Sequence, residues 1–423
     1  MIDLFSLDQA IQDQQYRFFN KDPGIQREID FQKYSAHQGI VIITGIRRCG
    51  KSTLLLQFKD FYNHVSYVNF DDDRFIRFTH DDFQTLLTLL LKLNPNVDVF
   101  FFDEIQNIAG WERFVRRLHD EGYKIFITGS NAHLLSSELG THLTGRYVKI
   151  ELFPFSFREI LQGKKIDPSD KTTQNLALVL KEFETFLSDG GFPEFIHYQE
   201  PEFVIRTYED ILYRDIVARY GIRDVSAVKL LAHYLMTNFT REYAYTSLVQ
   251  VSGLKSDTSV RNYIRFFEDA YLLFECVKYD YSLKRQFTQG KKIYAIDSGM
   301  RNAISLKFSQ DIGKSFENQV YIELIRRGYE VWYFRDKGEC DFIARRPGSM
   351  LAIQVCYEVT PDNFSREING LTEALEKTGA EAGILLTMNQ RTIPDYGGNM
   401  EKEIQVIPAW EWFTYLSDYC VIR

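Results

Sequence analysis

The sequence lacks paired cysteines, a long apolar run and an excess of basic residues. Its five cysteines are an odd number without a CxxC pair, which excludes a thiolate zinc site and fits a reducing compartment. No run approaches the ~18 apolar residues of a membrane span, and residues 1–15 lack the basic end and apolar core of a signal peptide. We therefore expect a cytoplasmic protein that does not enter membranes.

Basic residues are the minority among the charged ones, with 50 Lys and Arg against 58 Asp and Glu and a formal net charge of -8. A molecule of this charge repels polyanions as a whole, so any contact with nucleic acid must come from a local patch. Hydrophobic residues at 45% and charged residues at 26% are typical of folded globular proteins. A length of 423 residues allows about two to four domains.

Periodicity along the chain predicts a multidomain α/β protein. Apolar strands are expected at 39–44, 64–71, 97–103, 124–128 and 147–152, with helical stretches between them. This pattern indicates a parallel sheet with helices on both faces. A helical segment follows, broken by DGGFP at 189–193, and it has the size of a small lid.

Two further modules are expected after the lid. Three helix-sized segments and a β-hairpin, 274–281 and 292–296 joined by a Gly-Lys-Lys turn, are the parts of a winged helix-turn-helix. The remainder reads αβββαβ. The predicted domains are an α/β core at 1–155, a helical lid at 156–222, a winged helix at 223–308 and an αβββαβ domain at 309–423.

Residues 45–52, GIRRCGKS, match the phosphate-binding loop GxxxxGK[ST] between a strand and a helical run. The backbone N–H groups of such a loop surround phosphates, its lysine reaches the β- and γ-phosphates, and its serine ligates Mg²⁺. Arg47 and Arg48 have an alternative role, pairing with the acids at 71–73. The predicted nucleotide contacts of the loop are Gly45, Arg47, Arg48, Cys49, Gly50, Lys51, Ser52 and Thr53.

About fifty residues later, VFFFDE at 99–104 is an apolar strand that ends in two acids. Asp103 is expected to hold the Mg²⁺ shell together with Ser52, and Glu104 to polarise the attacking water. An acid at a strand end is, by itself, more often part of a solvated edge. Together with the loop and its Lys51, the pair favours hydrolysis of ATP and not only its binding.

These motifs resemble the AAA+-type ATPase domain of prokaryotic ATPases that carry a C-terminal DUF4143 region. The resemblance extends to ITGSNAHLLSSELGTHLTGRY at 127–147, GGFPEF at 190–195, YRDIVARY at 213–220 and FFEDAYLLF at 266–274. It implies that Ser130, or Asn131, is a polar sensor of the γ-phosphate, although either also suits a helix N-cap. It further places Pro193 near the adenine, where a plain helix break is the alternative.

The resemblance also implies that Arg146 is an arginine finger that reaches the nucleotide of a neighbouring subunit, which requires a homo-oligomer. A surface or core-anchoring arginine is the alternative. In the expected winged helix, Arg261, Asn262 and Arg265 form the polar side of a recognition helix, and the wing is basic, with Lys284, Arg285, Lys291 and Lys292. Such a module binds DNA or another protein.

The last domain resembles the PD-(D/E)XK nuclease-like fold, which implies a metal held by Glu317, Asp341 and Gln354. Gln354 stands where the fold has an acid and Cys356 where it has a lysine, and Glu358 is an imperfect substitute for the acid. We therefore expect this domain to bind a partner and not to cleave. A lysine from elsewhere, such as Lys337 or Lys314, is the alternative that would restore cleavage.

The sequence thus predicts an ATP- and Mg²⁺-dependent, ATP-hydrolysing AAA+-like protein whose nucleotide state repositions DNA- or protein-binding C-terminal modules. One alternative is a slow ATP-dependent switch or scaffold in a signalling or defence assembly. A second is an ATP-gated, metal-dependent nuclease.

Overall fold

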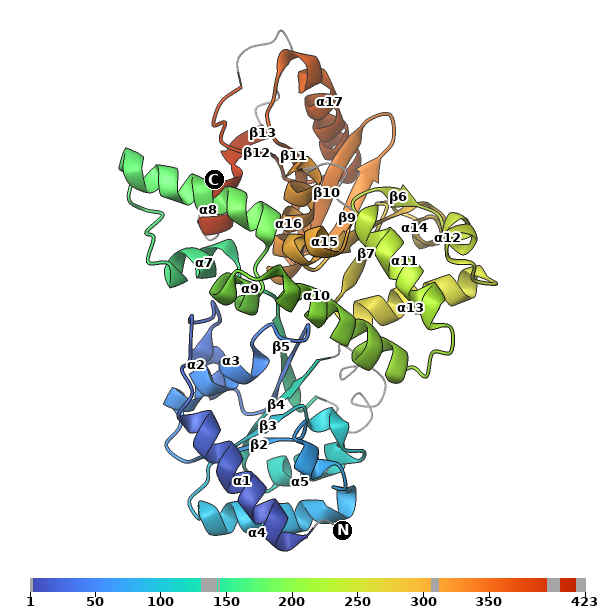
Figure 1. Cartoon of the computed structure of the whole chain (residues 1–423). Coiled ribbons are helices and arrows are strands. Elements are labelled where there is room, and N and C mark those ends of the chain that lie inside the picture. The colour runs from blue at the N-terminus through green and yellow to red at the C-terminus, as the bar shows by residue number, and fades with distance from the viewer. Residues whose placement is uncertain (1–2, 131–142, 144, 306–311, 394–403, 416–423) are drawn as a thin grey trace. The chain divides into compact units, whose positions relative to one another are not determined.

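The computed structural model describes residues 3–130, 143, 145–305, 312–393 and 404–415 (Figure 1). The chain divides into two compact units. The first consists of Met1–Phe153 and Asp269–Tyr271, and the second of Pro154–Glu268 and Leu272–Arg423. The predicted boundary after residue 155 lies close to this division, whereas the boundaries after 222 and 308 stay predictions.

The first unit is built on a parallel sheet of five strands in the order β2-β3-β4-β1-β5. The strands are β1 (Ile40–Gly45), β2 (Val65–Asn69), β3 (Val99–Asp103), β4 (Lys124–Gly129) and β5 (Tyr147–Leu152). Each falls within a few residues of its predicted range, which confirms the parallel sheet. Phe100, Phe101 and Phe102 are consecutive on β3 and all buried, so their side chains pack on both faces of the sheet.

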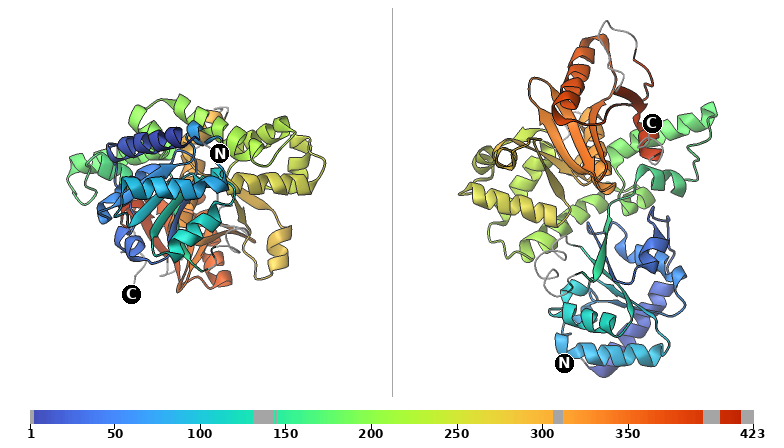
Figure 2. Two further views of the ribbon diagram at one scale, coloured as in Figure 1. Left: turned by 90° about the horizontal axis from the view of Figure 1, so that it is seen from below. Right: turned by 180° about the vertical axis from the view of Figure 1, so that it is seen from behind.

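Helices cover both faces of this sheet. One face packs against α1 (Leu4–Phe19), α4 (Phe83–Leu93) and α5 (Trp111–Asp120); α1 and α4 lie side by side (Figures 1 and 2). The other face packs against α3 (Lys51–Phe58), where Phe58 meets Phe126 of β4. The short helices are α2 (Phe31–Ala36), η1 (Lys59–Phe61), η2 (Asp73–Phe75), η3 (His80–Asp82) and η4 (Ile105–Asn107).

The second unit begins with helices, as predicted for a lid. They are α7 (Phe157–Gly163), α8 (Thr173–Asp189), α9 (Pro193–Tyr198), α10 (Pro201–Asp210) and the π-helical turn η6 (Ile211–Ala218). The predicted break at the double glycine is confirmed, because α8 ends at Asp189 and α9 starts at Pro193. No helix within the described ranges is long and apolar enough to cross a membrane.

A helical segment with a small antiparallel sheet comes next. It contains α11 (Val225–Thr237), α12 (Tyr245–Ser252), α13 (Asp257–Asp269), α14 (Leu283–Thr288), α15 (Ser298–Ile304), and a sheet of β6 (Glu242–Tyr243), β8 (Lys291–Ala295) and β7 (Leu273–Val277). β7 and β8 pair antiparallel, as the predicted hairpin requires, but the predicted Gly-Lys-Lys turn is wrong. The chain between the two strands contains α14, and Lys291 and Lys292 lie on β8 and are buried, because carboxylates and tyrosine rings of the same unit surround them.

The C-terminal segment has the predicted αβββαβ order with one more strand and helix. It comprises α16 (Ile312–Arg326), β9 (Glu330–Arg335), β10 (Glu339–Arg346), β11 (Ser349–Cys356), α17 (Pro361–Thr378), β12 (Ala382–Thr387), β13 (Ile404–Pro408) and α18 (Ala409–Thr414). The strands form a sheet in the order β13-β12-β11-β10-β9. Helix α17 packs on one face, where Leu371 meets the core around Ile343, and α16 on the other, where Tyr321 contacts Phe342.

The double glycine between α8 and α9 is held by a buried carboxylate. Asp297 Oδ2 accepts a hydrogen bond of 2.6 Å from the N–H of Gly191, and Asp297 Oδ1 accepts one of 2.9 Å from the N–H of Met300. A Cβ at Gly190 would lie 2.1 Å from this carboxylate. Burial raises the pKa of Asp297 to about 6, although the backbone donors oppose the shift.

Replacing Asp297 by Asn should make the stability difference from wild type depend on pH. Between the ordinary value of 3.8 and the folded value of about 6, the folded wild type retains a proton that the unfolded chain releases. Its free energy of unfolding, relative to that of Asp297→Asn, should therefore fall by about 3 kcal/mol as pH rises through this interval. Denaturant unfolding of both proteins at several pH values measures this difference; a constant or rising difference contradicts the prediction.

Candidate ATP site

The loop between β1 and α3 carries the predicted phosphate-binding residues at the carboxyl edge of the first sheet. β1 ends at Gly45 and α3 begins at Lys51. Gly45 packs so closely against β5 that a Cβ there would lie 2.0 Å from the carbonyl oxygen of Leu152. Gly50 caps α3 with a φ of +99°, which residues with a side chain rarely adopt. The path of the loop therefore requires both glycines.

The Lys51 side chain is folded into this loop and is 5% exposed. Its Nζ donates hydrogen bonds of 3.1 Å to the carbonyl oxygens of Gly45 and Ile46, and it lies 3.8 Å from Glu104 Oε1. A phosphate oxygen is a stronger acceptor for an ammonium group than a peptide carbonyl. Lys51 is thus placed to exchange these carbonyls for the phosphates of a nucleotide.

Asp103, at the end of β3, is the buried acid of the site. Its Oδ2 accepts a hydrogen bond of 2.8 Å from Tyr67, and Thr128 and Ser52 donate to the same carboxylate. Burial raises the pKa of Asp103, the neighbouring Glu104 carboxylate raises it further, and the three hydroxyl donors act in the opposite direction. The contact between Ser52 and Asp103 brings together the two predicted Mg²⁺ ligands.

Glu104 follows directly and has a left-handed backbone, with a φ of +50°. A non-glycine residue in this conformation is strained, and such residues concentrate at functional sites. Its N–H donates a 3.0 Å hydrogen bond to Thr128 Oγ1, which holds the turn, and its side chain accepts a hydrogen bond from Gln106. The carboxylate is 21% exposed and faces Lys51, so water can reach it.

The other predicted loop contacts differ in how they can act. Cys49 is fully buried, and its Sγ donates to the carbonyl oxygen of Leu152 at 3.4 Å. Burial also raises the pKa of its thiol. Cys49 can therefore contact a phosphate through its backbone and not through its side chain. Arg48 is exposed and has a φ of +62°. Arg47 and Thr53 are half-buried on the loop and first turn of α3. None of these features decides whether the arginines contact phosphate, which stays a prediction.

Ser130 and Arg146 lie at opposite edges of the sheet. Ser130 is buried and directly follows β4, the strand between β1 and β3, so it shares the carboxyl edge with the loop. Arg146 directly precedes β5, and its carbonyl oxygen accepts a hydrogen bond from Ile40, the first residue of β1. Its guanidinium Nη1 lies 3.0 Å from an oxygen of Asp120. Arg146 therefore cannot reach the loop of the same chain. Asn131 lies outside the described residues.

Three groups at or near the site were not identified from the sequence. Thr128 is a single polar residue near the end of the apolar strand KIFITG, which is a signal that its hydroxyl has a role. Tyr67 lies in the middle of β2, where nothing distinguishes it from a core aromatic residue. A third, Tyr271, belongs to the first unit although it is distant in sequence, and its hydroxyl lies 2.8 Å from Thr44 Oγ1 and donates to Glu151 at 3.0 Å.

Replacing Thr128 by Val, which has the same shape, should disturb both acids. The change leaves the Glu104 N–H without its acceptor and the Asp103 carboxylate without one donor, so the free energy of unfolding should fall by about 1–3 kcal/mol. Chemical unfolding measures the loss. Thr88→Val is the matched control, because Thr88 is exposed on α4 and donates only to the carbonyl of Gln84. Equal effects of the two changes would contradict the prediction.

The predicted C-terminal metal ligands come together in the second unit, but other groups engage them. Gln354 donates through Nε2 to Glu367 at 2.6 Å, and its Oε1 accepts from the N–H of Asp341 at 3.1 Å. Glu317 and Asp341 both face the ammonium of Lys292, at 3.3 and 3.9 Å. Among the residues that the structure describes, no three His, Cys, Asp or Glu side chains converge in a way that could hold a metal ion.

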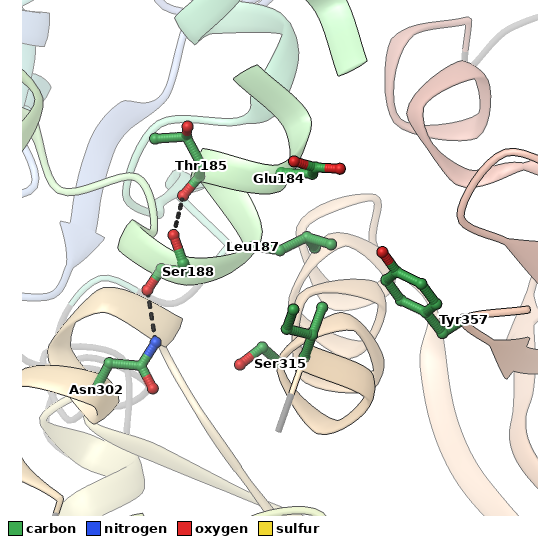
Figure 3. A pocket seen from close by; sticks show the side chains of 8 residues that line it. Glu184, Thr185, Leu187, Ser188, Asn302, Ser315 and Tyr357 are labelled. Atoms are coloured by element: carbon green, nitrogen blue, oxygen red, sulfur yellow. Dashed lines mark hydrogen bonds between the residues drawn. The ribbon is translucent and has the colours of Figure 1, made fainter. Parts of the chain in front are cut away.

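A pocket of about 320 Å³ also lies in the second unit, lined by residues of α8 and α16 and by Asn302 and Tyr357 (Figure 3). Ser188 donates to the carbonyl oxygen of Thr185 at 3.0 Å, and Asn302 donates to the carbonyl oxygen of Ser188 at 2.6 Å. Ser188 and Asn302 thus direct these polar groups to the protein itself. Pro193 begins α9 in the same unit, and its predicted position near an adenine stays a prediction.

Three family models match consecutive parts of the chain. Residues 37–161 match an AAA domain, residues 180–311 a domain of unknown function (DUF8612), and residues 312–412 a domain of unknown function (DUF4143). The DUF4143 match therefore covers the αβββαβ segment alone, and the segment expected to be a winged helix falls in the preceding model. The AAA match contains the loop, Asp103, Glu104 and Arg146.

Two relatives are similar over most of their length. An uncharacterized protein of Methanocaldococcus jannaschii is 35% identical over 399 residues, covering 88% of each chain. An uncharacterized protein of Haemophilus influenzae is 33% identical over 342 residues, covering 77% of this chain and 84% of the relative. The chain belongs to their family, that of AAA-type P-loop ATPases with a C-terminal DUF4143 domain, as the resemblance of the motifs indicated.

Solved structures are similar only at a low level. AMPPCP-bound DnaA from Aquifex aeolicus is 14% identical, with a TM-score of 0.27, over 56% of this chain and 84% of that chain. The ORC1 protein of Aeropyrum pernix, in complex with DNA, is 13% identical, with a TM-score of 0.29, over 68% of this chain and 94% of that chain. Superpositions of this quality do not relate individual residues of the two sites.

Proposed function

We propose that the chain binds ATP with Mg²⁺ at the loop of residues 45–52 and hydrolyses it, and that the nucleotide state repositions the C-terminal modules. One observation supports this most: Lys51, Ser52, Asp103 and Glu104 lie at one edge of the sheet, with Ser52 bonded to Asp103 and Lys51 facing Glu104. Phosphoryl transfer to water requires a loop that holds the phosphates, oxygen ligands for the cation and a carboxylate that water can reach. These residues supply all three.

The side chains present fit the divalent cation that accompanies ATP. A hydroxyl and a carboxylate in contact are oxygen ligands of the kind that Mg²⁺ takes alongside water and phosphate. Ser52 and Asp103 would hold the cation, which when bound neutralises the charge on the β- and γ-phosphates. The three hydroxyl donors to Asp103 fix the orientation of its carboxylate.

The remaining residues of the site have different roles in hydrolysis. Lys51 stabilises the charge that develops on the transferred phosphoryl group, because its ammonium is already desolvated within the loop. Glu104 orients a water molecule and accepts its proton, and the bond from Thr128 to its N–H fixes its position. Ser130, at the end of the adjacent strand, is placed to contact the γ-phosphate.

Arg146 acts, in this proposal, on the nucleotide of a neighbouring subunit. Its position at the opposite edge of the sheet excludes action within its own subunit, and its 37% exposure leaves the guanidinium accessible to a partner. The active form would then be a homo-oligomer in which each site is completed in trans.

DNA is the partner proposed for the α11–α13 segment, acting as a winged helix. Helix α13 buries Val260, Ile264 and Phe267 and exposes Arg261, Asn262 and Arg265, the polar side predicted for a recognition helix. Lys284 and Arg285 of α14 are also exposed. Since Lys291 and Lys292 are buried, these four are the cations of the predicted recognition helix and wing that remain exposed, and with Asn262 they would contact phosphates.

Reversing the charge of Arg261 should weaken DNA binding. Arg261→Glu removes one phosphate contact, so the slope of log affinity against log salt concentration should decrease in magnitude by about 1. Fluorescence anisotropy with labelled duplex DNA at several salt concentrations measures the slope. Arg206→Glu is the control, because Arg206 is an exposed arginine of α10 outside the proposed surface. Unchanged binding by the Arg261 variant would exclude this surface.

Phosphate release from ATP, measured with and without DNA on the full chain, tests the proposal as a whole. Release well above that of a Lys51→Ala variant is expected, with the mass in solution increasing when ATP and Mg²⁺ are present. Binding without release above that control would support the slow switch or scaffold instead. The absence of salt-sensitive DNA binding would leave a protein partner for the C-terminal modules.

A further inference from the structure

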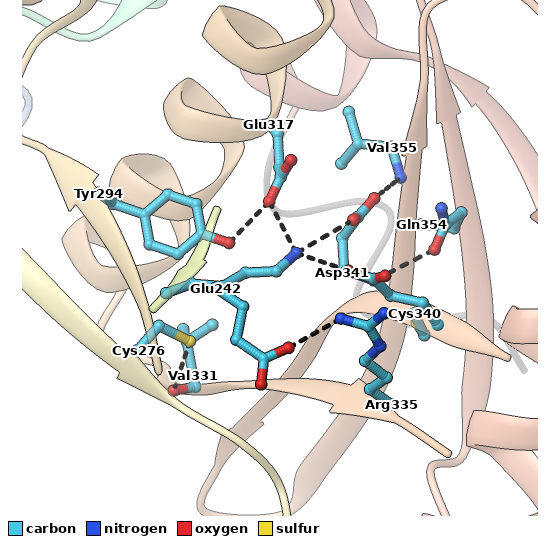
Figure 4. A network of polar contacts seen from close by, with 12 residues as sticks. Glu242, Cys276, Tyr294, Glu317, Val331, Arg335, Cys340, Asp341, Gln354 and Val355 are labelled. Carbon is cyan, nitrogen blue, oxygen red and sulfur yellow. Dashed lines mark hydrogen bonds and ion pairs between the residues drawn. The ribbon is translucent and has the colours of Figure 1, made fainter. Parts of the chain in front are cut away.

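Lys292 is a buried lysine in the middle of the C-terminal carboxylates. It lies on β8, ahead of the DUF4143 match, and is 5% exposed. Its Nζ lies 2.9 Å from Glu339 Oε1, 3.3 Å from Glu317 Oε1 and 3.9 Å from Asp341 Oδ1. Figure 4 shows Glu317 and Asp341 converging from a helix and a strand.

The surroundings keep this ammonium charged. The carboxylates of Glu317, Asp341 and Glu339 surround its Nζ at ion-pair distances. A buried charge is stable only when it is paired and hydrogen-bonded. Three carboxylates supply that pairing for Lys292, and Lys292 neutralises part of their mutual repulsion.

The nuclease-like fold would place a divalent cation between the helix carboxylate and the strand carboxylate. Here the oxygens that would ligate it are engaged by other groups. Glu317 Oε1 accepts a 2.8 Å hydrogen bond from Tyr294 besides facing Lys292, and Asp341 Oδ2 accepts one of 2.9 Å from the N–H of Val355. A divalent ion bonds to such oxygens at about 2.0–2.6 Å. The Lys292 ammonium faces the same two carboxylates and already balances their charge, so the residues as arranged do not fit the metal.

We propose that Lys292 is the resident cation of this site and takes the place of the divalent metal of nuclease-like domains. The carboxylates then form an ionic lock that joins β8 to α16 and β10, all within the second unit. Within the described part of the domain the cation is this ammonium and not a metal ion, and it comes from neither Lys314 nor Lys337, which the sequence suggested. This inference does not depend on the ATP site.

The test is a titration of the full, nucleotide-free chain with Mn²⁺, followed by electron paramagnetic resonance. Wild type and Asp341→Asn should bind the same amount of Mn²⁺, because Asp341 holds no metal. Lys292→Met should gain one Mn²⁺ site, and with it a rise in melting temperature on adding Mn²⁺. The double variant Lys292→Met/Asp341→Asn should lose that site. Lys181→Met is the control, since Lys181 is an exposed lysine of α8 outside this site, and it should behave as wild type.

Three results would overturn the proposal. One is a Mn²⁺ site in wild type that Asp341→Asn removes, and another is Mg²⁺- or Mn²⁺-dependent nicking of DNA that Asp341→Ala abolishes. The third is a folded Lys292→Met that gains no Mn²⁺ site. If Lys292→Met does not fold, the addition of Glu317→Gln should restore folding, because it removes one of the unpaired carboxylates. If the double variant does not recover, and the two substitutions lower the free energy of unfolding additively, the ionic lock is contradicted.

Discussion

Replacing Lys51 by Ala should lower the rate of phosphate release from ATP by about 10²–10³-fold, the usual effect of removing one preorganised stabilising group. The Lys51 ammonium is desolvated within the loop and held by two carbonyl oxygens and by Glu104. Without it, the β- and γ-phosphates lose the buried ammonium that this loop directs toward them. A coupled assay of phosphate release at saturating ATP measures the loss.

A lysine of the same segment provides the control for this change. Lys59, just after α3, is 42% exposed and lies 3.9 Å from the exposed Asp60. Lys59→Ala should release phosphate at the wild-type rate. A Lys51→Ala variant that stays within a few-fold of wild type would show that the measured activity does not come from this loop.

Replacing Glu104 by Gln should separate binding from hydrolysis. The amide has the same size but cannot accept a proton from water, so turnover should fall by about 10²–10⁴-fold. Lys51, Ser52 and the backbone of the loop are untouched, so ATP should still bind. Calorimetric titration with ATP and Mg²⁺, next to the phosphate-release assay, measures the two effects on the same preparation.

The control for this change is Glu121→Gln, at the end of α5, where Glu121 is exposed and pairs with Arg117. It should change neither binding nor turnover. Loss of ATP binding in Glu104→Gln would mean that Glu104 shapes the loop through its contact with Lys51 and does not act on water.

The arrangement of the candidate ATP site was largely predictable because its signals are local. GIRRCGKS is contiguous, the strand that ends in Asp103 and Glu104 is apolar throughout, and parallel strands necessarily bring their carboxyl ends to one edge. The same reasoning predicted the αβββαβ order of the C-terminal segment. Neither needed knowledge of contacts between distant residues.

The contacts that complete the site could not be predicted in this way. Tyr67 on β2 donates a hydrogen bond to Asp103 on the adjacent strand β3. Tyr271 belongs to the first unit although it comes from a segment far along the chain. Both lie in apolar runs in which an aromatic residue normally contributes only packing. Their hydroxyl partners become visible only once the strand order is known.

Lys292 shows the limit of local patterns most clearly. Two adjacent lysines after a glycine are typical of an exposed turn, and that prediction was wrong. Burial became favourable because Glu317, Glu339 and Asp341 converge on the position of Lys292 from elements that follow it in sequence. A local window contains the lysine but not the carboxylates that determine where it lies.

The most direct test of the central claim is the identity of the nucleotide that remains bound after incubation with ATP and Mg²⁺ and rapid removal of free nucleotide. Chromatography of the released nucleotide should show ADP from wild type, ATP from Glu104→Gln and neither from Lys51→Ala. Wild type that carries only intact ATP, or Glu104→Gln that converts ATP to ADP as fast as wild type, would contradict hydrolysis at this site.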